Sequence, residues 1–151
     1  LRQHTNVPLG TGEQLPTKWL FRELIEEELV DYLRVDLSHT GGITEGRKIA
    51  AMGEVHYQEM ATHMTGTVVN TLASLHLNMA VPNCAVQEYS PPRDWEQEVF
   101  RWDFRAEAGF LVPSEAPGLG VEIDEKAAAA HPPVHRESQH WRRPDGSVTD
   151  W

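Results

Sequence analysis

Four polar residues that could carry out acid–base chemistry recur along the first part of the chain: Glu13, Asp36, His63 and Glu88. Each follows a stretch that is predicted to be a β-strand, and successive members lie roughly 25 residues apart, a period typical of strand–helix units in a parallel sheet. Because the carboxyl ends of parallel strands meet at one edge of a sheet, we expect the four side chains to lie close together at that edge, around the mouth of one site.

An aspartate and a histidine at neighbouring strand ends can form a catalytic pair. The Asp36 carboxylate would accept a hydrogen bond from one ring nitrogen of His63, fix the tautomer and make the other nitrogen a better base. Glu13 and Glu88 could bind a hard cation or hydrogen-bond to substrate oxygens. A single strand-end histidine or glutamate is more often structural or solvated, so spacing alone leaves a functional cluster and a structural role both open.

The segments between these residues have the pattern of a β/α fold. Strands are predicted at residues 5–10, 32–35, 57–62 and 84–87, and helices are predicted to begin at Pro16–Thr17, at a Thr44 cap and at Gly66–Thr67. The residues expected to be buried are Trp19, Leu20, Leu24, Ile25 and Leu29 in the first helix, Ile49, Met52 and Val55 in the second, and Val68, Leu72, Leu75 and Met79 in the third.

Four strand–helix units in succession favour a β/α barrel over an open sheet, and four strands are half of an eight-stranded barrel. Past Tyr89 the period is lost. We therefore predict an α/β fold in which residues 1–90 form a partial barrel and residues 91–151 form an irregular C-terminal extension that packs over it. Within the extension, residues 100–104 and 109–112 are expected to pair as antiparallel strands, and Asp124 is expected to cap a short helix.

Composition narrows the classes of partner. The chain has 151 residues, about one domain, and a net charge of -10, which argues against nucleic acid or an anionic membrane as a partner. Cys84 is the only cysteine, so an internal disulfide is impossible and a reducing, cytoplasmic location is expected. No signal peptide is recognisable at the N-terminus, and the chain opens without an initiator Met, as expected of a processed chain or a piece of a longer one.

An ordered set of five segments runs through the chain: GTGEQLPTKW (10–19), VDLSHTGGITEGRKIAAMGE (35–54), ATHM (61–64), PNCAVQEY (82–89) and APGLGVEIDE (116–125). This set resembles the C-terminal part of the mandelate racemase/muconate lactonizing branch of the enolase superfamily, and within it the galactonate- and mannonate-type sugar-acid dehydratases. The resemblance reaches the closing RRPDGSVTDW (142–151). It implies a TIM barrel of which this chain would supply the C-terminal half, strands 5–8.

The resemblance also implies roles for the four strand-end residues. Glu13 would be the third ligand of an essential Mg²⁺, Asp36 the partner of the catalytic histidine, His63 the general acid/base and Glu88 a hydrogen-bonding partner of the substrate carboxylate. The implied reaction is that of a carbon–oxygen lyase, a hydro-lyase of sugar-acid catabolism. The proton alpha to the carboxylate is removed, the β-hydroxyl is lost as water, and a 2-keto-3-deoxy acid forms.

The chain departs from the family pattern in ways that keep other functions open. The strands that carry the other two Mg²⁺ ligands, and the capping domain that sets specificity, are not in this sequence. Around His63 the chain has T-H-M-T-G where relatives often have P-H-N-P. Two alternatives stay open. The first is a racemase or epimerase of the same superfamily, and the second is a non-catalytic truncated half-barrel that self-associates through its open edges. The full-length form is expected to be a homo-oligomer that acts on a small sugar acid.

Overall fold

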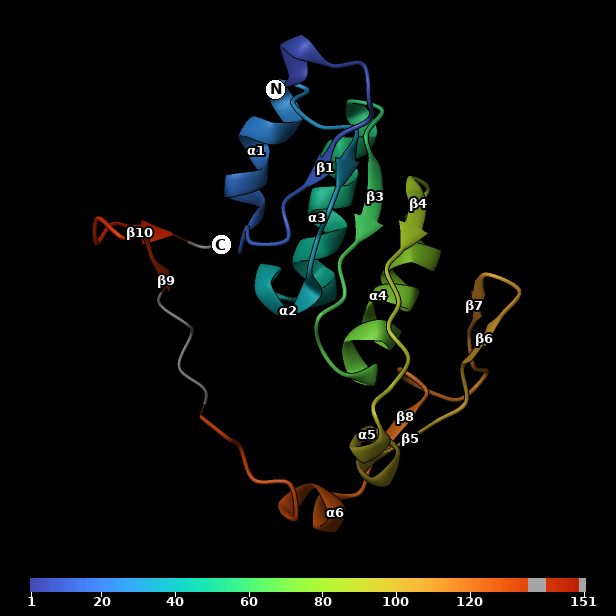
Figure 1. Cartoon of the computed structure of the whole chain (residues 1–151). Helices are drawn as coiled ribbons and strands as arrows, with labels where there is room; N and C mark the ends of the chain where they lie inside the picture. Colours follow the sequence, from blue (N-terminus) through green and yellow to red (C-terminus); the bar gives the residue numbers. More distant parts are fainter. Residues whose placement is uncertain (136–140, 150–151) are drawn as a thin grey trace.

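A four-stranded parallel sheet forms the centre of the computed structural model, which describes residues 1–135 and 141–149. Its strands β1 (Gly10–Thr11), β2 (Tyr32–Leu33), β3 (Glu59–Thr62) and β4 (Cys84–Gln87) lie side by side in chain order (Figure 1). Residues 136–140 and 150–151 of the predicted extension lie outside the described part.

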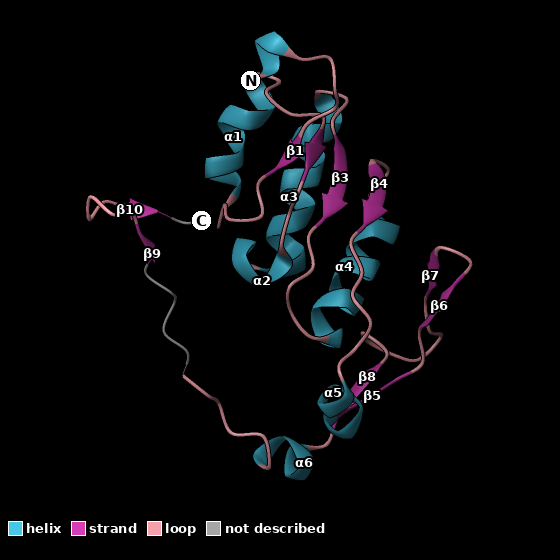
Figure 2. Cartoon of the chain, viewed as in Figure 1, coloured by secondary structure: helices cyan, strands magenta, loops and turns pink. Residues whose placement is uncertain are grey.

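Helices connect each strand to its parallel neighbour. After the 3₁₀ turn η1 (Arg2–His4) come α1 (Lys18–Glu26), α2 (Leu37–Thr40), α3 (Gly42–Val55) and α4 (Val68–Ala80). Figure 2 shows the long helices on one side of the sheet, as in the wall of a β/α barrel. The sequence-based prediction of successive strand–helix units is therefore confirmed. In residues 1–135 and 141–149, no helix is long and apolar enough to cross a membrane.

The first three predicted strands are longer than those that form, whereas the fourth, predicted at residues 84–87, is confirmed as β4. Residues 5–10 were expected as the first strand, but only Gly10–Thr11 pairs with β2. The third strand starts at Glu59 and not at Tyr57, because Tyr57 has a φ of 58° and is 96% exposed in the turn that precedes the strand. Extended pairing is incompatible with this left-handed backbone.

The apolar face of α1 differs from the predicted one. Phe21 and Ile25 are the buried residues of the helix, whereas Trp19 is 69% exposed and Leu20 is 51% exposed. Phe21 packs in a core with residues from the sheet and the segment after β2, from α3 and from α4, chiefly Leu33, Val35, Ile49, Met60 and Leu77. The spacing of Phe21 and Ile25 places one face of α1 against α3 and leaves the face with Leu20 uncovered.

Three further helix predictions are wrong in detail. Val55 and Met79 were expected in the core, but they are 75% and 64% exposed. Each lies in the last turn of its helix. Thr44 does not cap α3, because that helix already begins at Gly42; Gly41, with a φ of 104°, is its N-cap. The preceding SHT residues form the short helix α2, whose N-cap is Asp36.

The extension contains more regular structure than predicted. It contains α5 (Asp94–Val99), β5 (Phe100–Trp102), β6 (Arg105–Glu107), β7 (Phe110–Val112), β8 (Val121–Ile123), α6 (Glu125–Ala129), β9 (Trp141–Arg142) and β10 (Val148–Thr149).

The predicted pairing of residues 100–104 with 109–112 is wrong. Ala108 and Gly109 both have positive φ, so they form a tight turn that pairs β7 with β6 and leaves β5 to pair with β8. The Asp124 cap is confirmed, since its Oδ1 accepts hydrogen bonds from the backbone N–H groups of Lys126 and Ala127.

Apolar residues of the extension pack against α4. Val68 and Leu72 of that helix contact Phe104, and the partly buried side chains around them are Val69, Tyr89, Phe100, Trp102, Leu111, Leu119 and Val121. Glu96 of α5 adds a polar link: its buried carboxylate accepts a hydrogen bond of 2.8 Å from the backbone N–H of Val68. The extension therefore holds the N-terminal end of α4, just after the loop that carries His63.

Candidate active site

Asp36 and His63 meet at the C-terminal edge of the sheet. Asp36 lies three residues after β2 and His63 directly follows β3. His63 Nδ1 is 3.0 Å from Asp36 Oδ2, the Asp36 side chain is 0% exposed and that of His63 is 12% exposed. The His63 backbone N–H also donates to the carbonyl of Val35 at 3.0 Å, which fixes the histidine beside the neighbouring strand.

The Asp36 carboxylate is surrounded by hydrogen-bond donors. Its Oδ1 accepts from the backbone N–H and hydroxyl of Ser38 and from the Asn70 amide, at 2.8, 2.5 and 3.4 Å. Its Oδ2 accepts from His63 and from the Thr65 hydroxyl, the latter at 3.2 Å.

These donors decide the charge of Asp36. Burial raises the pKa of the carboxyl, but hydrogen bonds from Ser38, His63 and Thr65 outweigh this effect and hold the pKa below its usual range. A carboxylate only accepts hydrogen bonds, so His63 Nδ1 carries the proton that lies between the two residues. The lone pair of the neutral ring is then on Nε2, which is the arrangement of a general base.

Glu88 lies on the other side of the histidine. It follows β4, and its Oε2 is 3.8 Å from His63 Nε2. The same oxygen accepts from the backbone N–H of Met64 at 3.2 Å and from Arg34 at 3.0 Å, while 44% of the side chain is exposed. Glu88 is thus held beside the free ring nitrogen and is open to solvent.

Arg34 connects Glu88 to Glu13. Its Nη2 is 3.0 Å from Glu88 Oε2, and its Nε is 3.7 Å from Glu13 Oε2. The sequence analysis did not single out Arg34, although it lies in the strand predicted at residues 32–35, two residues before Asp36. The guanidinium reduces the repulsion between acidic groups that the parallel strands bring together.

The Glu13 loop is fixed by close packing. Gly12 has a φ of 126°, and a Cβ at this position would lie 2.5 Å from Cε1 of Phe21. His39 Nδ1 is 3.0 Å from the Glu13 carbonyl oxygen, so the short helix α2 also supports the loop. A residue other than glycine at position 12 would displace Glu13 from the mouth.

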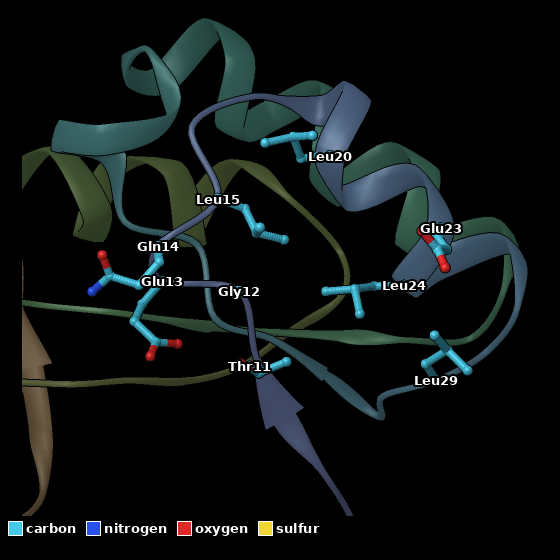
Figure 3. A pocket seen from close by; sticks show the side chains of 9 residues that line it. All are labelled: Thr11, Gly12, Glu13, Gln14, Leu15, Leu20, Glu23, Leu24 and Leu29. Carbon is cyan, nitrogen blue, oxygen red and sulfur yellow. The ribbon is translucent and has the colours of Figure 1, made fainter. Parts of the chain in front are cut away.

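A pocket of about 430 Å³ opens beside the Glu13 loop. Figure 3 shows Glu13 and Gln14 directed to one side, while the leucines of the pocket lie on the other, toward α1. Those leucines are Leu15, Leu20, Leu24 and Leu29. The apolar pocket adjoins the edge strand β1, and Leu20 is exposed because it lines this pocket. Neither Asp36 nor His63 lines it, so the pocket is separate from the acid–base pair.

The described residues do not complete a metal site. In residues 1–135 and 141–149, no group of three or more His, Cys, Asp or Glu side chains is placed to hold a metal ion. The Asp36 carboxylate is occupied by its donors, and Arg34 pairs with Glu88 at 3.0 Å and with Glu13 at 3.7 Å. Mg²⁺ requires six oxygen ligands in octahedral geometry, so these residues alone do not fit it.

The sequence of the chain matches those of known proteins. Residues 1–127 match the enolase C-terminal domain-like family. The chain belongs to this family. Over its full length it is 43% identical to a D-galactonate dehydratase family member from Streptomyces bingchenggensis and 39% identical to a D-mannonate dehydratase from Caulobacter vibrioides. It spans 37% and 38% of the length of these two relatives.

Solved structures of enolase-family proteins have the same fold. A crystal structure of an enolase from Pantoea ananatis with bound D-gluconate and Mg has a TM-score of 0.80 at 34% identity, over 85% of this chain and 32% of that one. A putative galactarate dehydratase from Agrobacterium radiobacter, with bound Na and L-malate, has a TM-score of 0.89 at 29% identity, over 97% of this chain and 41% of that one. The predicted family and fold class, the C-terminal half of a (β/α)8 barrel, are confirmed.

Proposed function

We propose that this enolase C-terminal domain-like chain carries the acid–base residues of a sugar-acid dehydratase. The observation that carries the proposal is the ring of His63, which is held by a buried, anionic Asp36 on one side and is close to Glu88 on the other. The relatives named as galactonate and mannonate dehydratases support a sugar acid as the substrate class.

In the proposed reaction, His63 Nε2 removes the proton from the carbon next to the substrate carboxylate. The electron pair of that C–H bond forms the enediolate, and Asp36 stabilises the imidazolium that results. The C–O bond at the β carbon then breaks, and the hydroxide leaves as water with a proton supplied by an acid. The enol product tautomerises to the 2-keto-3-deoxy acid.

Glu88 and Arg34 are proposed to bind the reacting end of the substrate. Glu88 would hydrogen-bond to the substrate carboxylate as that group becomes part of the enediolate, and such a hydrogen bond requires one proton between the two groups. Arg34 presents more N–H donors than its contacts with Glu13 and Glu88 use, so it can also offset the charge of an anionic substrate. We propose Glu13 as one Mg²⁺ ligand, with the remaining ligands supplied from outside the described residues.

A non-catalytic half-barrel is the second candidate. It is favoured by the uncovered edge of β1, where the apolar pocket and the exposed Leu20 lie. An open parallel edge promotes association with another chain. A chain of this kind would fold and associate without turning over a sugar acid. A racemase or epimerase would use the same His63 but would need a second base on the opposite face of the substrate.

The decisive experiment separates these functions by isotope labelling. The chain is purified alone and also mixed with the unmatched part of the Streptomyces relative, and both samples are incubated with Mg²⁺ and D-mannonate, D-galactonate or D-gluconate in D₂O. We expect NMR to show a 2-keto-3-deoxy acid in the mixture. His63→Asn should reduce its formation by about 10²–10⁴-fold, the usual contribution of a general base, and the exposed control His135→Asn should leave it unchanged.

Two other outcomes would refute the dehydratase. Deuterium at the α carbon without loss of water would identify a racemase or epimerase. The absence of both exchange and product in the mixture, with both chains shown to be folded and associated by circular dichroism and size-exclusion chromatography, would support the non-catalytic half-barrel.

A further inference from the structure

The loop between β3 and α4 contains a second residue that binds Asp36. The hydroxyl of Thr65 donates to Asp36 Oδ2 at 3.2 Å, and His63 Nδ1 lies 3.0 Å from the same oxygen. Thr65 lies two residues after His63 in the same loop. The Thr65 hydroxyl and the His63 ring therefore depend on the same carboxylate oxygen.

The backbone on both sides of Thr65 is held in place. His63 donates its backbone N–H to Val35 on one side. On the other side, the Thr67 hydroxyl caps α4 by accepting from the Val69 N–H. Thr65 is itself exposed, so its hydroxyl is positioned by the loop and not by burial of its own side chain.

Sharing one oxygen between two donors changes the strength of each hydrogen bond. The negative charge on Oδ2 is partly neutralised by the Thr65 hydroxyl, so the oxygen attracts a protonated His63 ring less strongly than it would alone. The charged groups around the ring are Asp36 at Nδ1, Glu88 at Nε2 and Arg34 next to Glu88. Thr65 differs from these groups because it acts without a charge of its own.

We propose that Thr65 is a positioning residue that lowers the proton affinity of His63 by sharing the Asp36 oxygen. The catalytic meaning of this role rests on the proposed dehydratase function, in which the same ring must take up and then release a proton. A ring that is bound too tightly to its proton would return it slowly. The contact itself can be tested without substrate.

The test is an NMR pH titration of the His63 ring in the folded chain and in three variants. Thr65→Val removes the hydroxyl and keeps the shape, and it should raise the midpoint of the His63 titration by about half a pH unit. Thr65→Ser keeps the hydroxyl and should restore the original midpoint. Thr67→Val removes a hydroxyl that caps α4 and does not bind Asp36, so it should lower stability without moving the midpoint.

Three results would overturn the proposal: an unchanged midpoint in Thr65→Val, an equal shift in Thr67→Val, or a Thr65→Ser variant that behaves like Thr65→Val. Each variant is first shown to be folded by its amide NMR spectrum. A shifted midpoint together with no sugar-acid turnover in the mixture of this chain with the unmatched part of the Streptomyces relative would keep the role of Thr65 and refute the dehydratase. An unchanged midpoint together with turnover in that mixture would refute the role of Thr65 and keep the dehydratase.

Discussion

Replacing Asp36 with asparagine would preserve the size of the side chain and remove the charge that five donor groups share. Hydrogen bonds to a charged acceptor contribute about 1.5–3 kcal/mol each. Removing the charge also removes the free-energy cost of burying it, which offsets part of the stability lost with these bonds. An asparagine accepts on one oxygen only, so about two of the bonds are lost. We expect Asp36→Asn to reduce the free energy of unfolding by about 3 kcal/mol at pH 7 and the Tm by about 6–12 °C.

The effect should depend on pH in a defined direction. The pKa of Asp36 is lower in the folded chain than in the unfolded chain, so its stabilisation is fully present above the unfolded pKa. It is lost as the pH falls through the lower pKa of the folded state. The difference in unfolding free energy between the original chain and Asp36→Asn should therefore be largest near neutral pH and should shrink in acid.

Thermal and urea unfolding followed by circular dichroism at several pH values would measure this difference. The matched control is Asp103→Asn, because Asp103 is exposed on the turn after β5 and should tolerate the change within about 0.5 kcal/mol. A loss below 1 kcal/mol at pH 7 for Asp36→Asn, or a loss that stays constant in acid, would show that the charge of Asp36 does not stabilise the fold as we argue.

Two further predictions concern the residues that position the site, each with a control of the same type. Gly12→Ala should lower the free energy of unfolding by about 3 kcal/mol, because Gly12 has a positive φ and the added Cβ would clash with Phe21. The control Gly118→Ala, at a φ of 70° with no atom within 4 Å, should lower it by only about 1 kcal/mol. Urea unfolding measures both values. Similar losses at both positions would refute the packing argument. Glu96→Ala should lower the free energy of unfolding by about 2 kcal/mol and speed amide hydrogen exchange at Val68, because it removes the acceptor of the Val68 N–H. The control Glu98→Ala removes an exposed ion pair with His131 and should lower the free energy of unfolding by less than about 1 kcal/mol. Equal exchange at Val68 in both variants would contradict the capping role of Glu96.

Much of the site could be predicted from the sequence because parallel strands with crossover helices repeat at a fixed interval. Asp36, His63 and Glu88 each follow a strand, and the sheet brings their side chains within hydrogen-bonding or near-contact distance. Asp124 was also identified as a helix cap, and a helix was predicted to begin at Gly66–Thr67, where the structure places the Thr67 cap of α4, since capping depends on the few residues around it. Roles for these residues in catalysis stay predictions.

The sequence was a poorer guide where a distant segment decides the outcome. Trp19 and Leu20 have the apolar character of core residues, but the structure leaves both exposed, Leu20 in the pocket beside β1. The strand β5 was assigned the wrong partner because two tight-turn residues close the hairpin between β6 and β7. Local pattern gives the type of an element, and its contacts depend on what the rest of the chain places next to it.

The sequence by itself determined the order of strand–helix units, the family and the polar residues at the strand ends, because these depend on local periodicity and on motifs. Only the tertiary structure decided the charge and orientation of the site. Arg34 lies between two acidic side chains, and Thr65 shares an oxygen of Asp36 with His63. These contacts join residues of different strands and loops, so their distances and the resulting pKa of Asp36 are set by packing and burial, which spacing along the chain does not specify.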